Sequence, residues 1–463
     1  MGYAMNANTG KSSGCVANIQ GMSFAEIVSL FGRFISWESV EARFKSRNRV
    51  FSDVRTFWLF LAQIIWGNIS CDAIIQKAIT WLVSETKKEV SPNNSGYTQA
   101  RQRLPSDMIR QASDQALAKL PPGKLFHGHA VKQVDGSGAT MADTEANRQE
   151  YPYRKGGKSY NAFPAMNFLL ILDWLTGTII DWAVGNAEVS ERSLFIATWP
   201  NLNPGDLVIG DRGFCGYWQF WWVQHHCGAF FLTRLHGSRK HRRITKDLGC
   251  NDHLVAWTKL SIHPRWLNAE EWAEVPGELI VREISTDISR HGFRVRQVTI
   301  VTTLLDETIS AEELLDLYRD RWNIEVNLRN LKITLGINIL RGKTPGVIEK
   351  EVSMFLLAYN LIRTIMFEAA DRHNVPLERI SFKATTTAIE TWGFLLAKAR
   401  TPAERETLLL QFYRVVAYPR CRNRRGRSEP RAVKRRPKTF QRLTGDRHSF
   451  KESPHRGRKY AAA

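Results

Sequence analysis

Two short apolar runs that each end in an aspartate constrain the fold of this chain most strongly. Val131–Asp135 predicts a strand that leads into Gly136-Ser137-Gly138, and Leu207-Val208-Ile209-Gly210 predicts a buried strand that leads to Asp211. If the two strands are parallel neighbours, their ends lie at the same edge of a sheet. The two aspartates are therefore expected to lie close together.

The residues between these strands predict a hairpin and a helix. Apolar runs at 165–174 and 178–184 flank Leu175-Thr176-Gly177, a turn sequence, and Ser190 can cap a helix that continues to Trp199. The order strand, hairpin, helix, strand indicates an α/β domain.

A helical pattern near residue 320 carries a third acid. Ser310 can cap a helix that runs through residue 332. At 100° per residue its side chains Tyr318, Arg321, Glu325 and Lys332 lie within a stripe about 60° wide, and Arg329 lies beside it. Taken alone, the pattern also fits a surface helix in which Glu325 pairs with arginines one turn away.

Asp135, Asp211 and Glu325 together predict a centre for phosphodiester chemistry. Two divalent ions about 3.5–4 Å apart need carboxylates that converge from separate elements. Two strand ends and one helix laid across the sheet can supply them.

The charge of the chain indicates a polyanionic partner. The net charge is +20 and the pI is about 9.8. From Arg420 onward, sixteen Lys and Arg stand against three Asp and Glu, so this segment carries +13. The tail is either a nonspecific DNA tether or a disordered end without a defined role.

Composition shifts divide the chain into four parts. Residues 1–22 are small and polar and are expected to be disordered, and residues 23–124 have helical patterns that predict an all-helical domain. Residues 125–400 are expected to form the catalytic domain, with a mainly antiparallel β insertion at about 228–303, and residues 401–463 a C-terminal segment with the basic tail.

The acids and their surroundings resemble the IS4 family of bacterial insertion-sequence transposases. Tyr318, Arg321, Glu325 and Lys332 match the Tyr-Arg-Glu-Lys signature of the family at its spacing. The segments 134–137 and 142–145 resemble its first-aspartate region, and 210–214 its second.

This resemblance implies the fold, the cofactor and the site. The fold is expected to be α/β, with an RNase H-like catalytic domain that the β insertion interrupts. The resemblance also implies that the helical domain at 23–124 binds DNA. Asp135, Asp211 and Glu325 are expected to bind two Mg²⁺ ions, with Mn²⁺ as a substitute. Tyr318, Arg321 and Lys332 are expected to hold phosphates and a displaced nucleotide at the DNA end. Arg329 joins the DNA-binding set from the helical wheel alone.

The sequence departs from the family at one position. Well-studied members stack a flipped base on a Trp in the last insertion strand, and residues 297–303 contain none. Trp257, Trp266 and Trp272 lie elsewhere in the insertion. The sequence therefore leaves open whether base flipping and a hairpin intermediate are used, and the expected cutting and joining chemistry does not depend on them.

The expected function is that of a DNA transposase. It binds the terminal inverted repeats of its element, cuts at the ends and joins the 3′ hydroxyls to target DNA in a cut-and-paste reaction. The partners are DNA and, when two ends are paired, a second copy of the chain. A nuclease or resolvase that cuts without joining, and a DNA-binding derivative without catalysis, are the alternatives.

The expected location is the bacterial cytoplasm, with the protein bound to the nucleoid through DNA. No signal peptide is visible, and the apolar runs are too short or too interrupted to span a bilayer. The six cysteines have no paired spacing, so neither a zinc site nor a disulfide framework is expected.

Three further acids lie near the expected strands. Asp173 and Asp181 flank the expected hairpin and are interpreted as turn or edge residues. Asp143 follows the first aspartate strand, and its role is either to support the site or to shape a loop.

Overall fold

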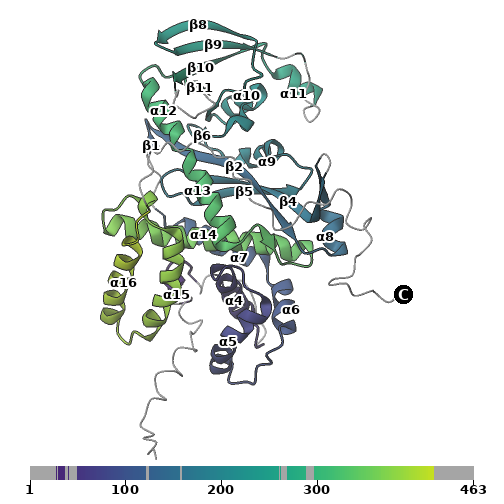
Figure 1. Ribbon diagram of the computed structural model, residues 1–463, viewed down its shortest axis with the longest axis vertical. Helices are drawn as coiled ribbons and strands as arrows, with labels where there is room; N and C mark the ends of the chain where they lie inside the picture. The colour runs from purple at the N-terminus through teal and green to yellow at the C-terminus, as the bar shows by residue number, and fades with distance from the viewer. Residues whose placement is uncertain are drawn as a thin grey trace, which may run out of the picture. The chain divides into compact units, whose positions relative to one another are not determined.

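The computed structural model describes residues 28, 30–36, 40, 49–120, 125–156, 159–259, 261, 268–287 and 297–421 (Figure 1). The start of the chain at 1–22 and the basic tail beyond residue 421, both discussed above, lie outside these residues.

The described residues form two compact units. The first holds residues up to 120, residues 334–336 and residues 352–421, and the second holds residues 121–333 and 337–351. The expected catalytic domain at 125–400 therefore divides between them. The reason is α14 (Pro345–Arg372), a continuous helix that begins in the second unit and continues into the first.

The described elements of the first unit are helices. They are α4 (Asp53–Ile65), α5 (Cys71–Thr86), α6 (Ser95–Arg103), α7 (Ser106–Leu117), the main part of α14, the short η4 (Leu377–Arg379), α15 (Phe382–Lys398) and α16 (Pro402–Ala417). The hydroxyl of Ser52 caps α4 by accepting from the Arg55 N–H. Ten consecutive residues of α4 are buried, as expected for a helix that is apolar on all sides.

Helix α14 corrects the expectation that no apolar run is long enough to span a bilayer. It has 28 residues, and among the described helices it passes that test by length and composition. However, 83% of its most apolar window is buried within the structure, which is typical of a core helix.

The second unit is built on one sheet of twelve described strands. The strands are β1 (Leu125–Phe126), β2 (His129–Met141), β3 (Tyr153–Gly156), β4 (Ser159–Asp173), β5 (Ile179–Asn186), β6 (Leu207–Ile209), β7 (Phe230–Arg234), β8 (Arg242–Gly249), β9 (Asp252–Thr258), β10 (Glu278–Asp287), β11 (Gln297–Thr302) and β12 (Ile339–Leu340). The fold is thus mixed α/β, with a large and mostly antiparallel sheet.

The centre of the sheet contains its parallel pairs. Strand β4 lies antiparallel between β2 and β5, whereas β6 lies parallel between β2 and β7. The expected hairpin corresponds to β4 and β5, and the expected helix to α9 (Glu191–Thr198) with the short η1 (Trp199–Asn201). This connection carries the chain from β5 to β6.

The run of antiparallel strands begins later than the expected bounds of about 228–303. Strand β7 lies within these bounds, but it pairs in parallel with β6 and belongs to the central sheet. The strands that follow extend the same sheet in the order β11, β10, β9, β8, through antiparallel pairs. Phe231 and Leu232 point to opposite faces of the sheet, and both are buried. Because β7 is covered on both faces, its sequence does not alternate between apolar and polar residues.

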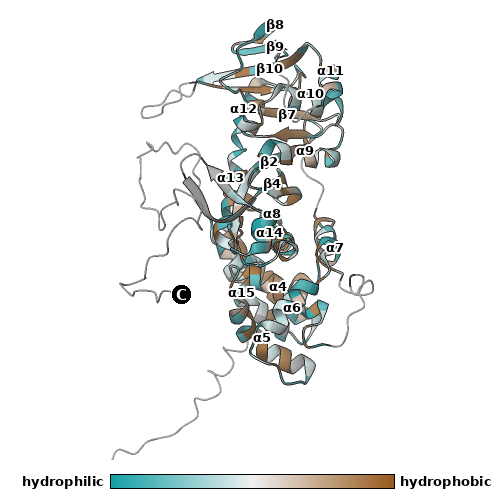
Figure 2. Cartoon of the chain, turned by 90° about the vertical axis from the view of Figure 1, so that its right-hand side faces the viewer, coloured by the Kyte–Doolittle hydropathy of each residue, from teal (hydrophilic) through white to brown (hydrophobic). Residues whose placement is uncertain are grey.

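Helices cover both faces of the central strands. On one face, α9 and α10 (Tyr217–His225) pack with Val134, Val208 and Phe231 in an aromatic-rich core. On the other, α12 (Ala311–Arg319) packs with residues that include Leu207 and Ile209. Figure 2 shows the contrast between the apolar β7 and the hydrophilic β8, whose residues are mostly exposed.

The remaining elements of the second unit are short. They are α8 (Glu145–Glu150), the turn η2 (Arg212–Phe214), α11 (Ala269–Glu274), α13 (Trp322–Arg329) and the π-helix η3 (Asn330–Leu335). The described cysteines are free.

Candidate active site

Asp135 lies in the middle of β2 and not at its end as expected, and Asp211 lies two residues beyond the end of β6. Gln133 of β2 pairs with Ile209, the last residue of β6. Continuing this register by two residues brings Asp135 opposite Asp211, where the backbone is still extended. The sequence-predicted convergence of the two aspartates is therefore consistent with the observed register.

The two aspartates face the side of the sheet that α12 covers. Side chains alternate along a strand, so Asp135 shares a face with Val131, and Asp211 shares a face with Leu207 and Ile209. Val131, Leu207 and Ile209 all pack against α12 in one core. The segment that carries Glu325 follows α12 directly.

Two hydrogen bonds fix this segment across β2 on either side of Asp135. The Gln133 amide donates to the Asp320 carbonyl at the end of α12 (3.1 Å), and the Lys332 ammonium donates to the Ser137 hydroxyl (2.9 Å). Gln133, Asp135 and Ser137 are two residues apart along β2, so their side chains point to the same face of the sheet. The stretch from Asp320 to Lys332 therefore crosses the strand over Asp135.

The expected single helix is wrong in detail, because the stretch consists of three segments. Tyr318 is on α12, Arg321 is the residue before α13, Glu325 and Arg329 are on α13, and Lys332 is on the π-helix η3. A straight helix would keep the predicted stripe, whereas a break and a π-turn rotate its members relative to one another. Arg329 is exposed at the end of α13.

Arg321 holds Glu325 in the structure. Its guanidinium donates to the Glu325 carboxylate (2.9 Å), and it lies 5.9 Å from the centre of the Tyr318 ring and 5.6 Å from that of Trp322. The Arg321 side chain is 14% exposed and that of Glu325 is 42% exposed. The ion pair considered above for a surface helix is therefore present, within the segment that crosses Asp135.

The electrostatics of Asp135 show that acids gather near it. Burial, the largest effect, raises the pKa of Asp135 from 3.8 to about 6; the Gly136 N–H lowers it, and the carboxylates of Asp211 and Glu191 raise it. Burial also raises the pKa of the Tyr318 phenol. A carboxyl that is buried beside two other acids is a place where a cation is favourable.

Two of the three expected acids suit a divalent cation. Asp135 and Asp211 supply the hard oxygen ligands that Mg²⁺ prefers. Within the part of the chain that the structure describes, however, no group of three His, Cys, Asp or Glu side chains is arranged to hold a metal ion. The third acid, Glu325, accepts a hydrogen bond from Arg321 instead.

Comparison with known proteins identifies the family. Residues 127–361, about half of the chain and including all three acids, match the family model described as Transposase DDE domain. The chain belongs to the DDE transposase family.

Curated relatives of this transposase agree. It is 25% identical over 351 residues to transposase InsG for insertion sequence element IS4 from Escherichia coli strain K12, across 74% of this chain and 77% of InsG. It is 33% identical over 87 residues to a probable transposase for element IS5377 from Geobacillus stearothermophilus, across 19% of this chain and 22% of that one. The sequence resemblance to IS4 transposases is confirmed.

One solved structure covers most of the transposase. It is the cryo-EM structure of the piggyBac transposase synaptic complex with hairpin DNA, at 10% identity and a TM-score of 0.42, over 85% of this chain and 82% of that chain.

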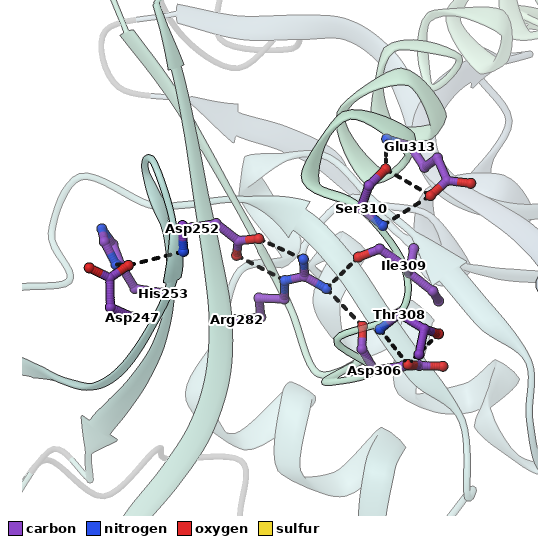
Figure 3. Close-up of polar contacts among 10 residues, drawn as sticks. Asp247, Asp252, His253, Arg282, Asp306, Thr308, Ile309, Ser310 and Glu313 are labelled. Atoms are coloured by element: carbon purple, nitrogen blue, oxygen red, sulfur yellow. Dashed lines mark hydrogen bonds and ion pairs between the residues drawn. The ribbon is translucent and has the colours of Figure 1, made fainter.

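A buried arginine fixes the start of α12 in the transposase (Figure 3). Arg282 of β10 makes two hydrogen bonds to Asp252 of β9 (2.9 and 2.6 Å) and donates to the carbonyls of Asp306 and Ile309 (both 2.8 Å). Arg282 is 2% exposed. Strands β9 and β10 therefore hold the loop from which α12 begins, and the Glu325 segment follows α12.

The predicted cap of α12 is also present. Ser310 accepts from the Glu313 N–H, and Glu313 accepts from the Ser310 N–H in a capping box. The imidazole of His127 lies 2.8 Å from Glu313. The Ser310 hydroxyl, the largest influence, lowers the pKa of Glu313 to about 2.

The other acids have structural partners. Asp173 accepts from the Thr176 N–H and hydroxyl in the hairpin turn, and Asp181 accepts from Asn201. Asp143 accepts from Arg148 (3.0 Å) and from the Tyr153 hydroxyl (2.8 Å). The turn interpretation of Asp173 is confirmed.

The insertion offers few candidates for a base-stacking tryptophan. Trp257 is completely buried, and its indole N–H donates to Glu283. Trp272 lies beneath the Lys259 ammonium, 4.1 Å from the ring centre, and Trp266 is outside the described residues. Trp257 would have to leave the core to reach DNA.

Two residues near the aspartates were missed by the sequence reasoning. Glu191 lies against Gly136, next to Asp135, and Arg192 contacts Gly213, close to Asp211. A signal was available, because both residues directly follow Ser190, the expected helix cap. The sequence does not reveal that this helix begins at the edge where the aspartates lie.

Proposed function

We propose that this transposase binds the terminal inverted repeats of an insertion sequence, cleaves at the ends of the element and joins the 3′ hydroxyls to target DNA. The observation that carries the proposal is the register of β2 and β6, which brings Asp135, in the middle of β2, opposite Asp211, just beyond the end of β6, beneath the segment that carries Glu325. InsG, which is similar over 74% of this chain, is named as the transposase for insertion sequence element IS4.

The topology supports an RNase H-like catalytic domain. Three antiparallel strands, β5, β4 and β2, are followed across the sheet by the parallel β6 and β7, with α9 in the connection from β5 to β6. In this arrangement the first and fourth strands along the chain are neighbours. Asp135 lies within the first of them, β2, and Asp211 lies two residues beyond the end of the fourth, β6.

Asp135, Asp211 and Glu325 are proposed as the ligands of two Mg²⁺ ions, with Mn²⁺ as a substitute. Bound there, the ions would lower the pKa of the attacking water or hydroxyl and neutralise charge on the leaving oxygen. The strands hold the two aspartates in place, and the helix supplies the third acid.

Arg321 is proposed to exchange partners when DNA binds. A guanidinium binds phosphate through the same two-donor geometry with which it binds a carboxylate. A DNA phosphate at Arg321 would therefore compete with Glu325 and release it toward Asp135. Tyr318 and Lys332 flank this position along the segment, and Arg329 is proposed as a further phosphate contact.

The other parts of the chain are assigned to binding. The helices at 49–120 are proposed to recognise the terminal repeats, and a homodimer is proposed to pair two ends. The expected basic tail would add nonspecific attraction to DNA through counterion release. The protein is proposed to act in the cytoplasm, where the DNA is.

The experiment compares wild type with Glu325→Gln on labelled DNA that carries the ends of the element, with Mg²⁺. Cleavage, joining and gel-shift binding are scored separately. We expect wild type to cut and join, and Glu325→Gln to bind without doing either. Cutting without joining by wild type would favour a nuclease or resolvase. Binding alone by both proteins would favour a derivative without catalysis.

A further inference from the structure

Each catalytic aspartate is hydrogen-bonded to a glycine that follows it. Asp135 Oδ1 accepts from the Gly136 N–H (2.8 Å), and Asp211 Oδ1 accepts from the Gly213 N–H (2.7 Å). In each case the orientation of the carboxylate depends on the position of the glycine backbone.

Two adjacent residues of α9 contact these two glycines. The side chain of Glu191 covers Gly136, since a Cβ built on Gly136 would lie 2.5 Å from both Cγ and Cδ of Glu191. Arg192 Nε donates to the Gly213 carbonyl (2.6 Å). A Cβ on Gly213 would lie 2.8 Å from Asp211 Oδ1, so this glycine also lets the aspartate fold back on its own backbone.

The first turn of α9 is itself well anchored. The Ser190 hydroxyl accepts from the Ser193 N–H (3.2 Å), which caps the helix. Leu194 and Phe195 are buried in the core beneath the sheet. Glu191 and Arg192 are exposed, but their backbone is fixed by the cap and by this packing.

We propose that Glu191 and Arg192 are positioning residues that hold Asp135–Gly136 of β2 and the turn from Asp211 to Gly213 at a fixed separation. Successive residues of β2 point to opposite faces of the sheet, so Gly136 faces α9 whereas Asp135 faces the Glu325 segment. Glu191 therefore contacts β2 on the face opposite to Glu325. The helix thus connects the middle of β2 with the turn that follows the end of β6. The inference rests on the proposed function, in which the two carboxylates share divalent cations.

The first test concerns Arg192. Full-length wild type, Arg192→Met and Arg192→Lys are titrated with Mn²⁺ alone, without DNA, and the Mg²⁺ concentration for half-maximal cleavage is measured separately. We expect Arg192→Met to weaken Mn²⁺ binding about tenfold, as loss of a group that orients a metal ligand does. The maximal cleavage rate should change little. Arg192→Lys keeps one donor for Gly213 and should recover most of the affinity.

A matched control separates position from charge. Arg243→Met removes an exposed arginine whose pair with Glu278 is 3.5 Å long, at the far edge strand β8. We expect its Mn²⁺ affinity to equal that of wild type. A comparable loss in Arg243→Met and Arg192→Met would overturn the positioning role.

The second test concerns Glu191 and remains informative if Arg192→Met fails to fold. Gly136→Ala should displace the flexible Glu191 side chain, because the new Cβ occupies its place. Glu191→Ala removes the same side chain. We therefore expect each variant to weaken Mn²⁺ binding by a similar factor and the double variant to be no worse than either, with Glu188→Ala as a control of equal charge. Additive losses would contradict the contact.

Asp211→Asn distinguishes failure of this inference from failure of the proposed function. If Asp211→Asn loses Mn²⁺ affinity while the α9 variants do not, only the positioning role fails. If wild type and Asp211→Asn bind Mn²⁺ equally or not at all, the proposed metal site fails, and the inference fails with it.

Discussion

The two aspartates and the Glu325 segment are placed by different kinds of interaction. Asp135 and Asp211 follow from the register of two paired strands and from bonds to their own glycines. Glu325 lies on the short helix α13, between the break after α12 and the π-helix η3, and it forms an ion pair with Arg321. Register fixes a position through many backbone bonds, whereas an exposed ion pair contributes little and can exchange partners. One half of the site is therefore preformed and the other half is adjustable.

The largest expected effect comes from the anchor of the adjustable half. Arg282→Met leaves Asp252 buried without its partner, and we expect a loss of about 3–5 kcal/mol of stability. Urea unfolding of the full-length protein measures it. Replacing both residues, by Arg282→Met with Asp252→Leu, should restore most of the loss. If Arg282→Met is as stable as wild type, the insertion does not anchor the Glu325 segment.

Neutralising the preformed half should abolish chemistry and leave DNA binding unchanged. Loss of a group that only supports a metal ligand lowers activity by up to about 100-fold. For Asp135→Asn and Asp211→Asn, which alter the proposed ligands themselves, we expect the cleavage rate to fall by more than this. Rates on labelled ends and gel shifts measure the two effects. Asp173→Asn, which alters a turn acid, serves as the control. Cleavage retained in either aspartate variant would break the comparison.

Removing Arg321 should weaken binding to the DNA ends, unlike the aspartate variants. A hydrogen bond to a charged group contributes about 1.5–3 kcal/mol, so Arg321→Ala should lose roughly tenfold or more in affinity. Arg319→Ala, which removes an exposed arginine paired with Asp316, is the control and should remain close to wild type. Unchanged affinity in Arg321→Ala would mean that Arg321 serves only to hold Glu325.

The smallest expected effect compares two helix caps. Ser190→Ala and Ser310→Ala should each cost about 1 kcal/mol, since each removes an acceptor for a first-turn N–H. Thermal melting measures the cost. We expect Ser190→Ala to raise the Mg²⁺ requirement of cleavage more than Ser310→Ala, because α9 contacts the glycines next to both aspartates. If both variants require the same Mg²⁺ concentration, the cap of α9 does not affect the aspartates more than the cap of α12 does.

Much of this protein could be predicted from local patterns. The end of β6 before Asp211, the caps Ser190 and Ser310 and the turn at Asp173 depend on neighbours within a few residues. The expected strand end at Asp135 is wrong, because pairing with β4 continues β2 to Met141. The spacing of Tyr318, Arg321, Glu325 and Lys332 identified the family that the comparison with known transposases confirms. The roles of these residues remain predictions.

Only the tertiary structure decided the rest, because those features depend on contacts between residues far apart in the chain. The break before Arg321 places Asp320 against Gln133, and the π-turn places Lys332 against Ser137. No local pattern encodes these contacts, nor the contacts of Glu191 and Arg192 with Gly136 and Gly213. Sequence periodicity determines which side of an element is apolar. The packing of distant elements determines which polar groups meet at its end.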